Sequence, residues 1–259
     1  MNISDLYSHD DASNLTKLRD IKKYAHTISF REKLYSAEKN LSDFLTVCNN
    51  PIISCGGGKD GTAVALLATL IGAKVPIICA VPPNPLPDRE KHNRELRRFL
   101  GFEWTDVPYD WDVDAVLHGQ KPYPEGLKMR VLSEYQAAHR IDGVIFGVRA
   151  AESRSRSINA AVNGASYILK DGGKRCQPIV KWSAYDSLCL ALLLDAPINP
   201  VYEKMGGVEN IEQLHDGTWW PHGLDDRLGW MRRYYPEYAE KYEKALEIQK
   251  GGGFLTCRY

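Results

Sequence analysis

Three consecutive glycines, Gly56–Gly58, constrain this sequence more than any other feature, because they interrupt two apolar segments in the stretch SCGGGKDGTAVALLATL (54–70). The apolar run 51–55 before them predicts a strand, and the run 60–71 after them predicts a buried helix. The loop between the first strand and first helix of an α/β sheet lies at the carboxyl ends of the strands. Ligands bind at that edge.

The residue types in and after this loop favour a phosphate ligand. Glycines let the backbone approach a ligand closely, and successive N–H groups at a helix start form an anion-binding nest. Lys59 adds a full positive charge, and Thr62 adds a hydroxyl. Asp60 suits the helix N-cap, or a metal ion beside the phosphates. The alternative is a glycine-rich turn without a ligand.

Strand-like and helix-like segments continue to alternate along the chain. This order predicts a parallel sheet covered on both faces. We expect strands at 75–81, 102–109 and 143–148, and helices at 88–100, 125–140 and 184–194, the last capped by Ser183. Residues 157–177 read as a polar excursion, and PIVKW (178–182) as a short extended segment. We divide the chain into a helical segment (1–50, with a helix over 13–48), a nucleotide-binding domain (51–205) and a helical C-terminal lobe with a tail (206–259).

A second polar motif, GVRAAESRSR (147–156), follows the strand candidate 143–148 and should therefore lie at the same sheet edge. Arg149, Arg154 and Arg156 supply guanidinium groups, which suit bidentate capture of phosphate or sulfate. Glu152 is placed to orient one of them. The alternative is a solvated loop whose charges pair among themselves.

Composition excludes several classes of function. Lys plus Arg equal Asp plus Glu, so general affinity for nucleic acid or anionic membranes is not indicated. No apolar run approaches the ~20 residues of a membrane span, and the polar N-terminus lacks a signal-peptide pattern, so we expect a cytoplasmic protein. The six cysteines form no C-x-x-C pair, so we expect buried thiols and no iron–sulfur cluster.

The segment 56–62 resembles the S-G-G-K-D-S loop of the N-type ATP pyrophosphatases, the PP-loop enzymes. The glycine pair, Lys59, Asp60 and Thr62 fit that pattern. Two serines of the motif are replaced here, by Gly56 and Gly61; those serines normally help to hold phosphate. Ser54 and Thr62 are the nearby hydroxyls.

The second motif is similar to G-x-R-x-x-E-S-x-x-R of the phosphoadenosine-phosphosulfate (PAPS) reductase family. The positions that match this family, in order along the chain, are Gly147, Arg149, Glu152, Ser153 and Arg156, then Pro178, Ile179, Trp182 and Asp186, then INPVY (198–202). The resemblance implies an adenine nucleotide alpha hydrolase-like α/β fold. In that fold a parallel five-stranded sheet lies between helices and binds the nucleotide over its carboxyl edge.

The resemblance also implies a chemistry: Mg²⁺-dependent cleavage of ATP between the α and β phosphates, releasing pyrophosphate and leading to AMP or an adenylate, often on the way to sulfur transfer. Lys59 would bind phosphate, Asp60 a metal or the helix cap, and Arg149 and Arg156 the anionic tail or a second substrate. The expected nucleotide-binding residues are Ser54, Gly56, Gly57, Gly58, Gly61, Thr62, Ala80, Val81, Gly147, Glu152 and Ser153. Ala80 and Val81 enter by position, through backbone contact with adenine.

Two alternatives stay open. A PAPS reductase would use the tail thiol Cys257, next to Arg258, with thioredoxin or glutaredoxin resolving the product. A nucleotide-binding module without turnover is compatible with the glycines at 56 and 61. The acceptor substrate is open, and so is assembly as a homodimer.

Overall fold

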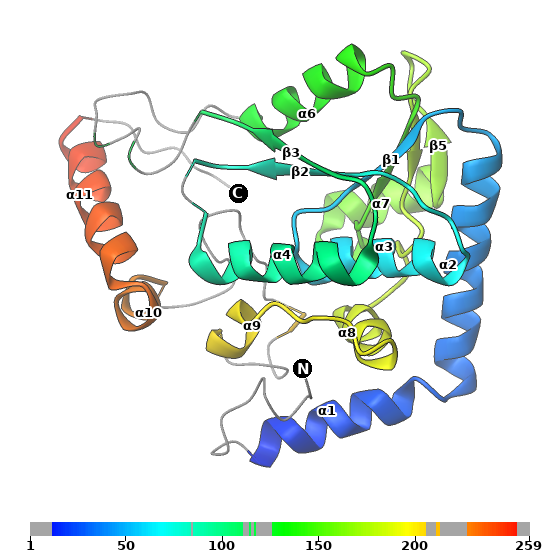
Figure 1. Cartoon of the computed structure of the whole chain (residues 1–259), viewed down its shortest axis with the longest axis horizontal. Helices are drawn as coiled ribbons and strands as arrows, with labels where there is room; N and C mark the ends of the chain where they lie inside the picture. The colour runs from blue at the N-terminus through cyan, green and yellow to red at the C-terminus, as the bar shows by residue number, and fades with distance from the viewer. Residues whose placement is uncertain are drawn as a thin grey trace.

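A computed structural model gives the fold as a six-stranded sheet flanked by helices (Figure 1). The structure describes residues 12–83, 85–110, 114, 117, 126–205, 211–212 and 227–252. The strand order is β3-β2-β1-β4-β6-β5. The strands are β1 Pro51–Ser54, β2 Ile77–Val81, β3 Trp104–Pro108, β4 Gly143–Phe146, β5 Ser166–Ile168 and β6 Lys174–Cys176. Neighbouring strands are parallel except β5, which is antiparallel to β6.

Helices cover both faces of the sheet, as the alternating pattern predicts. In Figure 1, α6 lies on one face and α3 and α4 lie on the other, with α8 beyond α3. The main helices are α1 Ala12–Tyr24, α2 Ile28–Thr46, α3 Lys59–Leu70, α4 Pro87–Leu100, α6 Leu127–Ala138, α7 Arg154–Asn163, α8 Ala184–Leu193, α9 Val201–Lys204, α10 Arg227–Tyr234 and α11 Pro236–Gly252. A 3-10 turn, η2 Ala150–Glu152, precedes α7.

Each central strand sends alternate side chains to opposite faces of the sheet. Ile53 joins the core on the α3 side, and its neighbour Ile52 joins the core on the α6 side. Ile145 and Val144 divide in the same way. Strands buried on both faces lack a polar alternation, and this explains their continuous apolar runs in the sequence.

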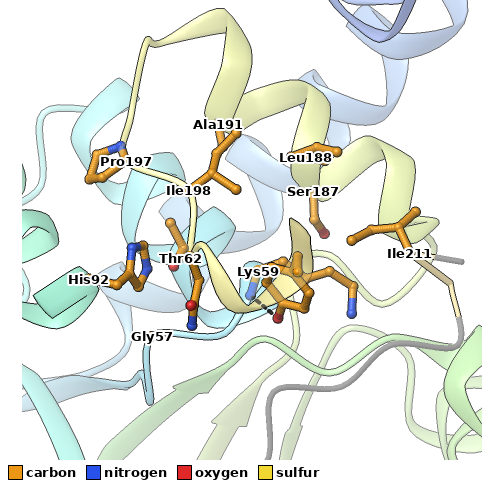
Figure 2. Close-up of a pocket in the computed structure, with 12 residues that line it drawn as sticks. Gly57, Lys59, Thr62, His92, Ser187, Leu188, Ala191, Pro197, Ile198 and Ile211 are labelled. Carbon is orange, nitrogen blue, oxygen red and sulfur yellow. Dashed lines mark hydrogen bonds between the residues drawn. The ribbon is translucent and has the colours of Figure 1, made fainter. Parts of the chain in front are cut away.

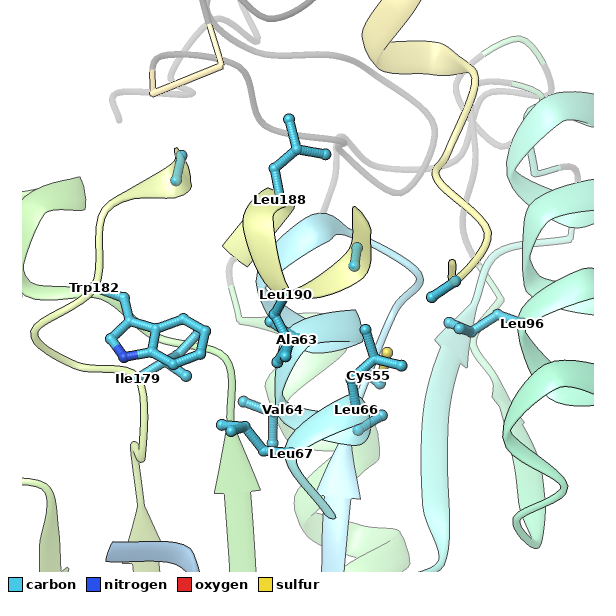
Figure 3. Close-up of a cluster of buried hydrophobic side chains, with 14 of the residues drawn as sticks. Cys55, Ala63, Val64, Leu66, Leu67, Leu96, Ile179, Trp182, Leu188 and Leu190 are labelled. Carbon is cyan, nitrogen blue, oxygen red and sulfur yellow. The ribbon is translucent and has the colours of Figure 1, made fainter. Parts of the chain in front are cut away.

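Helix α3 is apolar on nearly every side because it is enclosed. It packs between the sheet and α8, as Figure 3 shows for Val64, Leu67 and Leu190. A helix that is hydrophobic all round is stable only when buried in this way. The N-terminus of α3, with the glycines before it, is thereby held rigidly at the carboxyl edge of β1.

The structure corrects three sequence predictions. The helix expected over 13–48 is two helices, because the chain turns at 25–27 and Thr27 caps α2 by accepting a hydrogen bond from the Phe30 N–H. The polar excursion contains most of α7, together with β5 and β6. The segment PIVKW is a turn and not an extended piece.

The predicted sheet is confirmed and enlarged. Five strands run parallel, as the family resemblance implies, but the sequence analysis did not locate the fifth of these, β6, or the antiparallel edge strand β5. The capping box at the start of α8 is confirmed: Ser183 and Asp186 exchange hydrogen bonds. In the C-terminal lobe, α10 and α11 are helical, as predicted. No helix within the described ranges is long and apolar enough to cross a membrane.

Candidate functional site

The glycine loop, Gly56–Gly58, joins β1 to α3. Gly57 has a φ of +83°, which a residue with a side chain rarely adopts, so a glycine is required there. Gly58, with extended backbone, is the N-cap of α3, and no side chain caps the helix. The prediction that Asp60 is the N-cap is therefore wrong; Asp60 lies inside the first turn.

The arginine segment, Gly147–Arg156, touches the glycine loop's helix directly. A Cβ on Gly147 would lie 2.4 Å from the backbone carbonyl of Asp60 and 2.5 Å from the N of Gly61. Only glycine allows so close an approach of the two backbones. The two motifs found in the sequence therefore meet at one edge of the sheet.

A buried ion network joins the two segments. Arg149, which is 0% exposed, places Nε 2.9 Å from Asp60 Oδ1 and Nη1 2.9 Å from Glu212 Oε2. Asp60 Oδ1 also accepts a hydrogen bond from Ser187 Oγ at 2.7 Å. Lys59 Nζ lies 3.4 Å from Asp60 Oδ2. One carboxylate thus stands between two cations.

Burial and charge shift the pKa values of these cations in opposite directions. Burial lowers the pKa of Lys59 below its ordinary 10.5, although Asp60 acts against the shift. Burial also acts to lower the pKa of Arg149, but Asp60 and Glu212 outweigh it and the net shift is upward. Desolvation therefore dominates at Lys59, whereas neighbouring carboxylates outweigh it at Arg149.

The other polar residues of the arginine segment stabilise its own turn. Glu152 accepts a hydrogen bond from the Arg149 N–H at 2.8 Å and forms an ion pair with Arg156. Ser153 is the N-cap of α7 and accepts from the Arg156 N–H. Glu152 orients an arginine, as predicted. Arg156, with a side chain 44% exposed, lies at the surface.

Backbone donors of the predicted anion nest already have partners within the chain. The Lys59 N–H donates to the Tyr202 hydroxyl at 3.0 Å. The Gly57 backbone hydrogen-bonds the thiol of Cys55, whose pKa burial raises to about 12. Cys55 is therefore a protonated, buried thiol. Tyr202, from the INPVY segment, sits where an anion would meet the start of α3.

Helix α4 contributes polar residues that the sequence analysis did not select. Arg89, His92 and Asn93 are all buried and face the glycine loop. A Cβ on Gly57 would lie 1.9 Å from Asn93 Oδ1, a second reason for glycine there. Their spacing matches the buried stripe of α4 that continues through Leu96 to Leu100, and polar residues within such a stripe were the available signal.

His92 should make the fold sensitive to acid. Burial, and Arg89 beside it, hold the pKa of His92 at about 4 although it hydrogen-bonds the Gly57 backbone. The imidazole of His92 has a pKa near 6.5 in the unfolded chain, which therefore binds the proton more readily than the folded chain does. The stabilisation from the neutral, buried imidazole is present above pH 6.5 and is lost toward pH 4.

Between pH 7 and 4, the free energy of unfolding should fall by about 3 kcal/mol more than in His92→Gln. Urea titrations at each pH measure this, with the exposed His139→Gln as control. Parallel curves for wild type and His92→Gln would contradict the burial of a neutral imidazole.

Behind the loop, a small cavity lies between α3, α4, α8 and the segment 197–202 (Figure 2). Thr62 Oγ1 and His92 Nδ1 border it and have no hydrogen-bond partner among the described residues. Leu188, Ala191 and Ile198 contribute apolar surface to its wall. Its volume of about 20 Å³ admits roughly one water. A cavity of this size is too small for a nucleotide.

The remaining candidates divide by position. Ser54 ends β1 next to the loop, and Ala80 and Val81 end β2. The Val81 carbonyl accepts from the Tyr109 N–H, which leaves it engaged within the sheet. Cys257 lies outside the described residues.

The expected metal ligand Asp60 does not fit a magnesium ion. Its carboxylate already contacts Arg149, Lys59 and Ser187. A cation bound there would face two positive charges. Elsewhere in the described part of the chain, no three His, Cys, Asp or Glu residues are grouped to hold a metal. We therefore derive no step through a metal at this carboxylate.

Comparison with known proteins identifies the fold. No model of a known protein family matches the chain, and no curated protein sequence matches it. The PAPS reductase of Candida auris, solved as a phosphate complex, matches with a TM-score of 0.53 at 12% identity, over 72% of this chain and 89% of the reductase. The chain has the fold of PAPS reductase. The resemblance expected from the two motifs is confirmed at the level of the fold.

Two other enzymes match the fold with similar TM-scores. FMN adenylyltransferase of Candida glabrata, in complex with FMN and the ATP analogue AMPCPP, matches with a TM-score of 0.53 at 13% identity, over 84% of this chain and 79% of the enzyme. Yeast FAD synthetase matches with a TM-score of 0.51 at 14% identity, over 73% and 70%. The fold is thus shared by enzymes of different reactions, and the site must distinguish between them.

Proposed function

We propose that this protein is a PP-loop enzyme that binds ATP at the carboxyl edge of its sheet and cleaves it between the α and β phosphates. The bond from the α phosphorus to the bridging oxygen breaks and pyrophosphate leaves, while water or a nucleophilic group of the acceptor bonds to that phosphorus, giving AMP or an adenylated acceptor. One observation carries the proposal: the glycine loop and the arginine segment meet, and Lys59 lies buried beside their meeting point, where burial opposes its positive charge. A bound polyphosphate would offset that cost.

Solved complexes of a protein with the same fold support the choice of ligand. Candida glabrata FMN adenylyltransferase has been solved with ATP and with FAD plus inorganic pyrophosphate. By analogy of fold, we place the polyphosphate of ATP against the glycine loop and the start of α3. The Tyr202 hydroxyl, which now accepts from the Lys59 N–H, gives way to a phosphate oxygen in this arrangement.

The mechanism is electrostatic and uses the chain's own residues. Lys59 and the N-terminus of α3 stabilise the negative charge that develops on the leaving pyrophosphate. Arg149 is not placed against the nucleotide, because its guanidinium is paired with Asp60 and Glu212; it positions Asp60 and through it Lys59. Arg156, which lies at the surface in the first turn of α7, is the candidate contact for the anionic tail or acceptor.

The test is to identify the products of ATP turnover. Purified full-length protein is incubated with Mg-ATP, and the products are resolved by ion-exchange chromatography. We expect AMP or an adenylate together with pyrophosphate, in equal amounts. Production of ADP and orthophosphate would refute α–β cleavage. Tight binding of ATP with no products over hours would identify a nucleotide-binding module instead.

The tail cysteine separates this reaction from that of a thiol-dependent reductase. Cys257→Ser should leave the rate of pyrophosphate release unchanged, because no step of the proposed mechanism uses a thiol. Loss of activity in this variant, with sulfite released from PAPS by the wild type in the presence of thioredoxin, would favour the reductase.

A further inference from the structure

Arg89 is a buried cation packed beneath the glycine loop. It lies in the first turn of α4, at the same sheet edge as the loop, and is only 3% exposed. Its Nη2 lies 2.8 Å from the place where a Cβ on Gly56 would stand. The guanidinium thus occupies the space in which any side chain at position 56 would begin.

The charge of Arg89 has no counterion in the described part of the chain. Nη1 has no hydrogen-bond partner there, and no described carboxylate lies within 4.0 Å of the guanidinium. The acidic neighbours are engaged elsewhere: Asp88 pairs with Lys204, and Glu90 with Arg94. The nearby His92 is neutral at physiological pH. A buried charge without an anion, at a helix N-terminus that disfavours cations, is costly for a fold.

We propose that Arg89 is a phosphate ligand of the glycine loop and replaces the hydroxyl that Gly56 lacks. Position 56 is where the PP-loop motif carries a serine. A planar guanidinium at that position can hold the pyrophosphate part of a nucleotide through two parallel hydrogen bonds. The proposal rests on the proposed function and adds to it the group that compensates the departure from the motif.

The second departure from the motif has a different cause. A Cβ on Gly61 would lie 3.1 Å from Cys55 Sγ and 3.3 Å from Cys55 Cα, so packing fills that space. No cation stands there. Only the glycine at position 56 is matched by a charged group, and this difference singles out Arg89.

Calorimetry with inorganic pyrophosphate and, separately, with ATP tests the proposal on the full-length protein. In Arg89→Met we expect pyrophosphate affinity to fall about 10- to 100-fold. The melting temperature should not fall, because the variant removes a buried charge that no described carboxylate neutralises. Arg94→Met, on the exposed side of α4, is the matched control and should bind as the wild type does. Unchanged pyrophosphate affinity in Arg89→Met would overturn the proposal, as would a fall in melting temperature with affinity retained.

A reciprocal variant tests the replacement itself. Gly56→Ser alone should weaken binding, because the new side chain collides with the guanidinium. In the Arg89→Ala background the same serine has room and should restore part of the lost affinity. Equal effects of Gly56→Ser in both backgrounds would show that the two positions are not coupled, and would contradict the replacement.

The two proposals can fail separately. Pyrophosphate binding that depends on Arg89, without cleavage of ATP, refutes the proposed reaction and retains the ligand. Cleavage of ATP that is indifferent to Arg89→Met refutes the ligand and retains the reaction. A wild-type chain that binds neither pyrophosphate nor ATP at millimolar concentration overturns both.

Discussion

Arg149→Met should lower the free energy of unfolding by about 3–5 kcal/mol. Arg149 is wholly buried and ties Asp60, on α3, to Glu212, which itself accepts a hydrogen bond from the Ala184 N–H at the start of α8. Methionine fills similar space but removes the closest cation that the structure describes at the buried Asp60 carboxylate. Breaking a buried pair by removing one partner costs far more than a surface pair. Chemical denaturation monitored by circular dichroism gives the difference.

The double variant Arg149→Met/Asp60→Asn separates loss of charge pairing from loss of packing. With both charges removed, the destabilisation should be smaller than in Arg149→Met alone, because no buried carboxylate lacks its partner. Arg156→Met is the matched control and should lose less than about 1 kcal/mol, since its ion pair with Glu152 is exposed on the arginine side. A loss in Arg149→Met no larger than that of Arg156→Met would contradict the buried network.

Lys59→Met should slow pyrophosphate release from ATP by about 100- to 1,000-fold. Lys59 is the cation closest to the start of α3, with a side chain only 5% exposed. Its lowered pKa means that the free protein holds the charge at a cost, which a bound polyphosphate would relieve. Stability should therefore be retained in the variant while catalysis is lost. Rapid-quench measurement of the products gives the rate.

The pH dependence of binding provides an independent check on Lys59. Because the pKa of Lys59 is lowered, Lys59 loses its proton in the free protein at a pH below 10.5. ATP affinity should therefore fall as the pH rises through that lowered pKa.

The exposed Lys91→Met on α4 is the control for the loss of one positive charge in Lys59→Met, and it should keep the wild-type rate. A Lys59→Met variant with wild-type turnover would remove Lys59 from the mechanism.

The fold was predictable because its core strands are continuous apolar runs in the sequence. Ile52 and Ile53, like Val144 and Ile145, serve opposite faces of one sheet, and such pairs leave continuous apolar runs. Strand β6 was missed for the opposite reason: Lys174 and Arg175 are only partly buried, next to the edge strand β5. Helix α7 buries none of its residues, so no apolar stripe marks it.

The site was predictable where local motifs encode it and not where tertiary contacts do. Gly147 and Asp60 belong to recognisable segments, and their meeting follows from parallel strands sharing an edge. Arg89 and His92 belong to no motif. They lie on α4, whose many charged residues indicate a solvent-exposed helix as long as its neighbours in the fold are unknown. Glu212 contacts Arg149 although the two are 63 residues apart in the sequence, and no sequence pattern predicts this contact.

A crystal structure of the protein with AMPCPP tests the central claim most directly. The account predicts that the analogue's β and γ phosphates lie within hydrogen-bond distance of the Gly56–Lys59 backbone and of Lys59 Nζ, with the Tyr202 hydroxyl displaced from the Lys59 N–H. Phosphates bound away from the meeting point of the glycine loop and the arginine segment would contradict it.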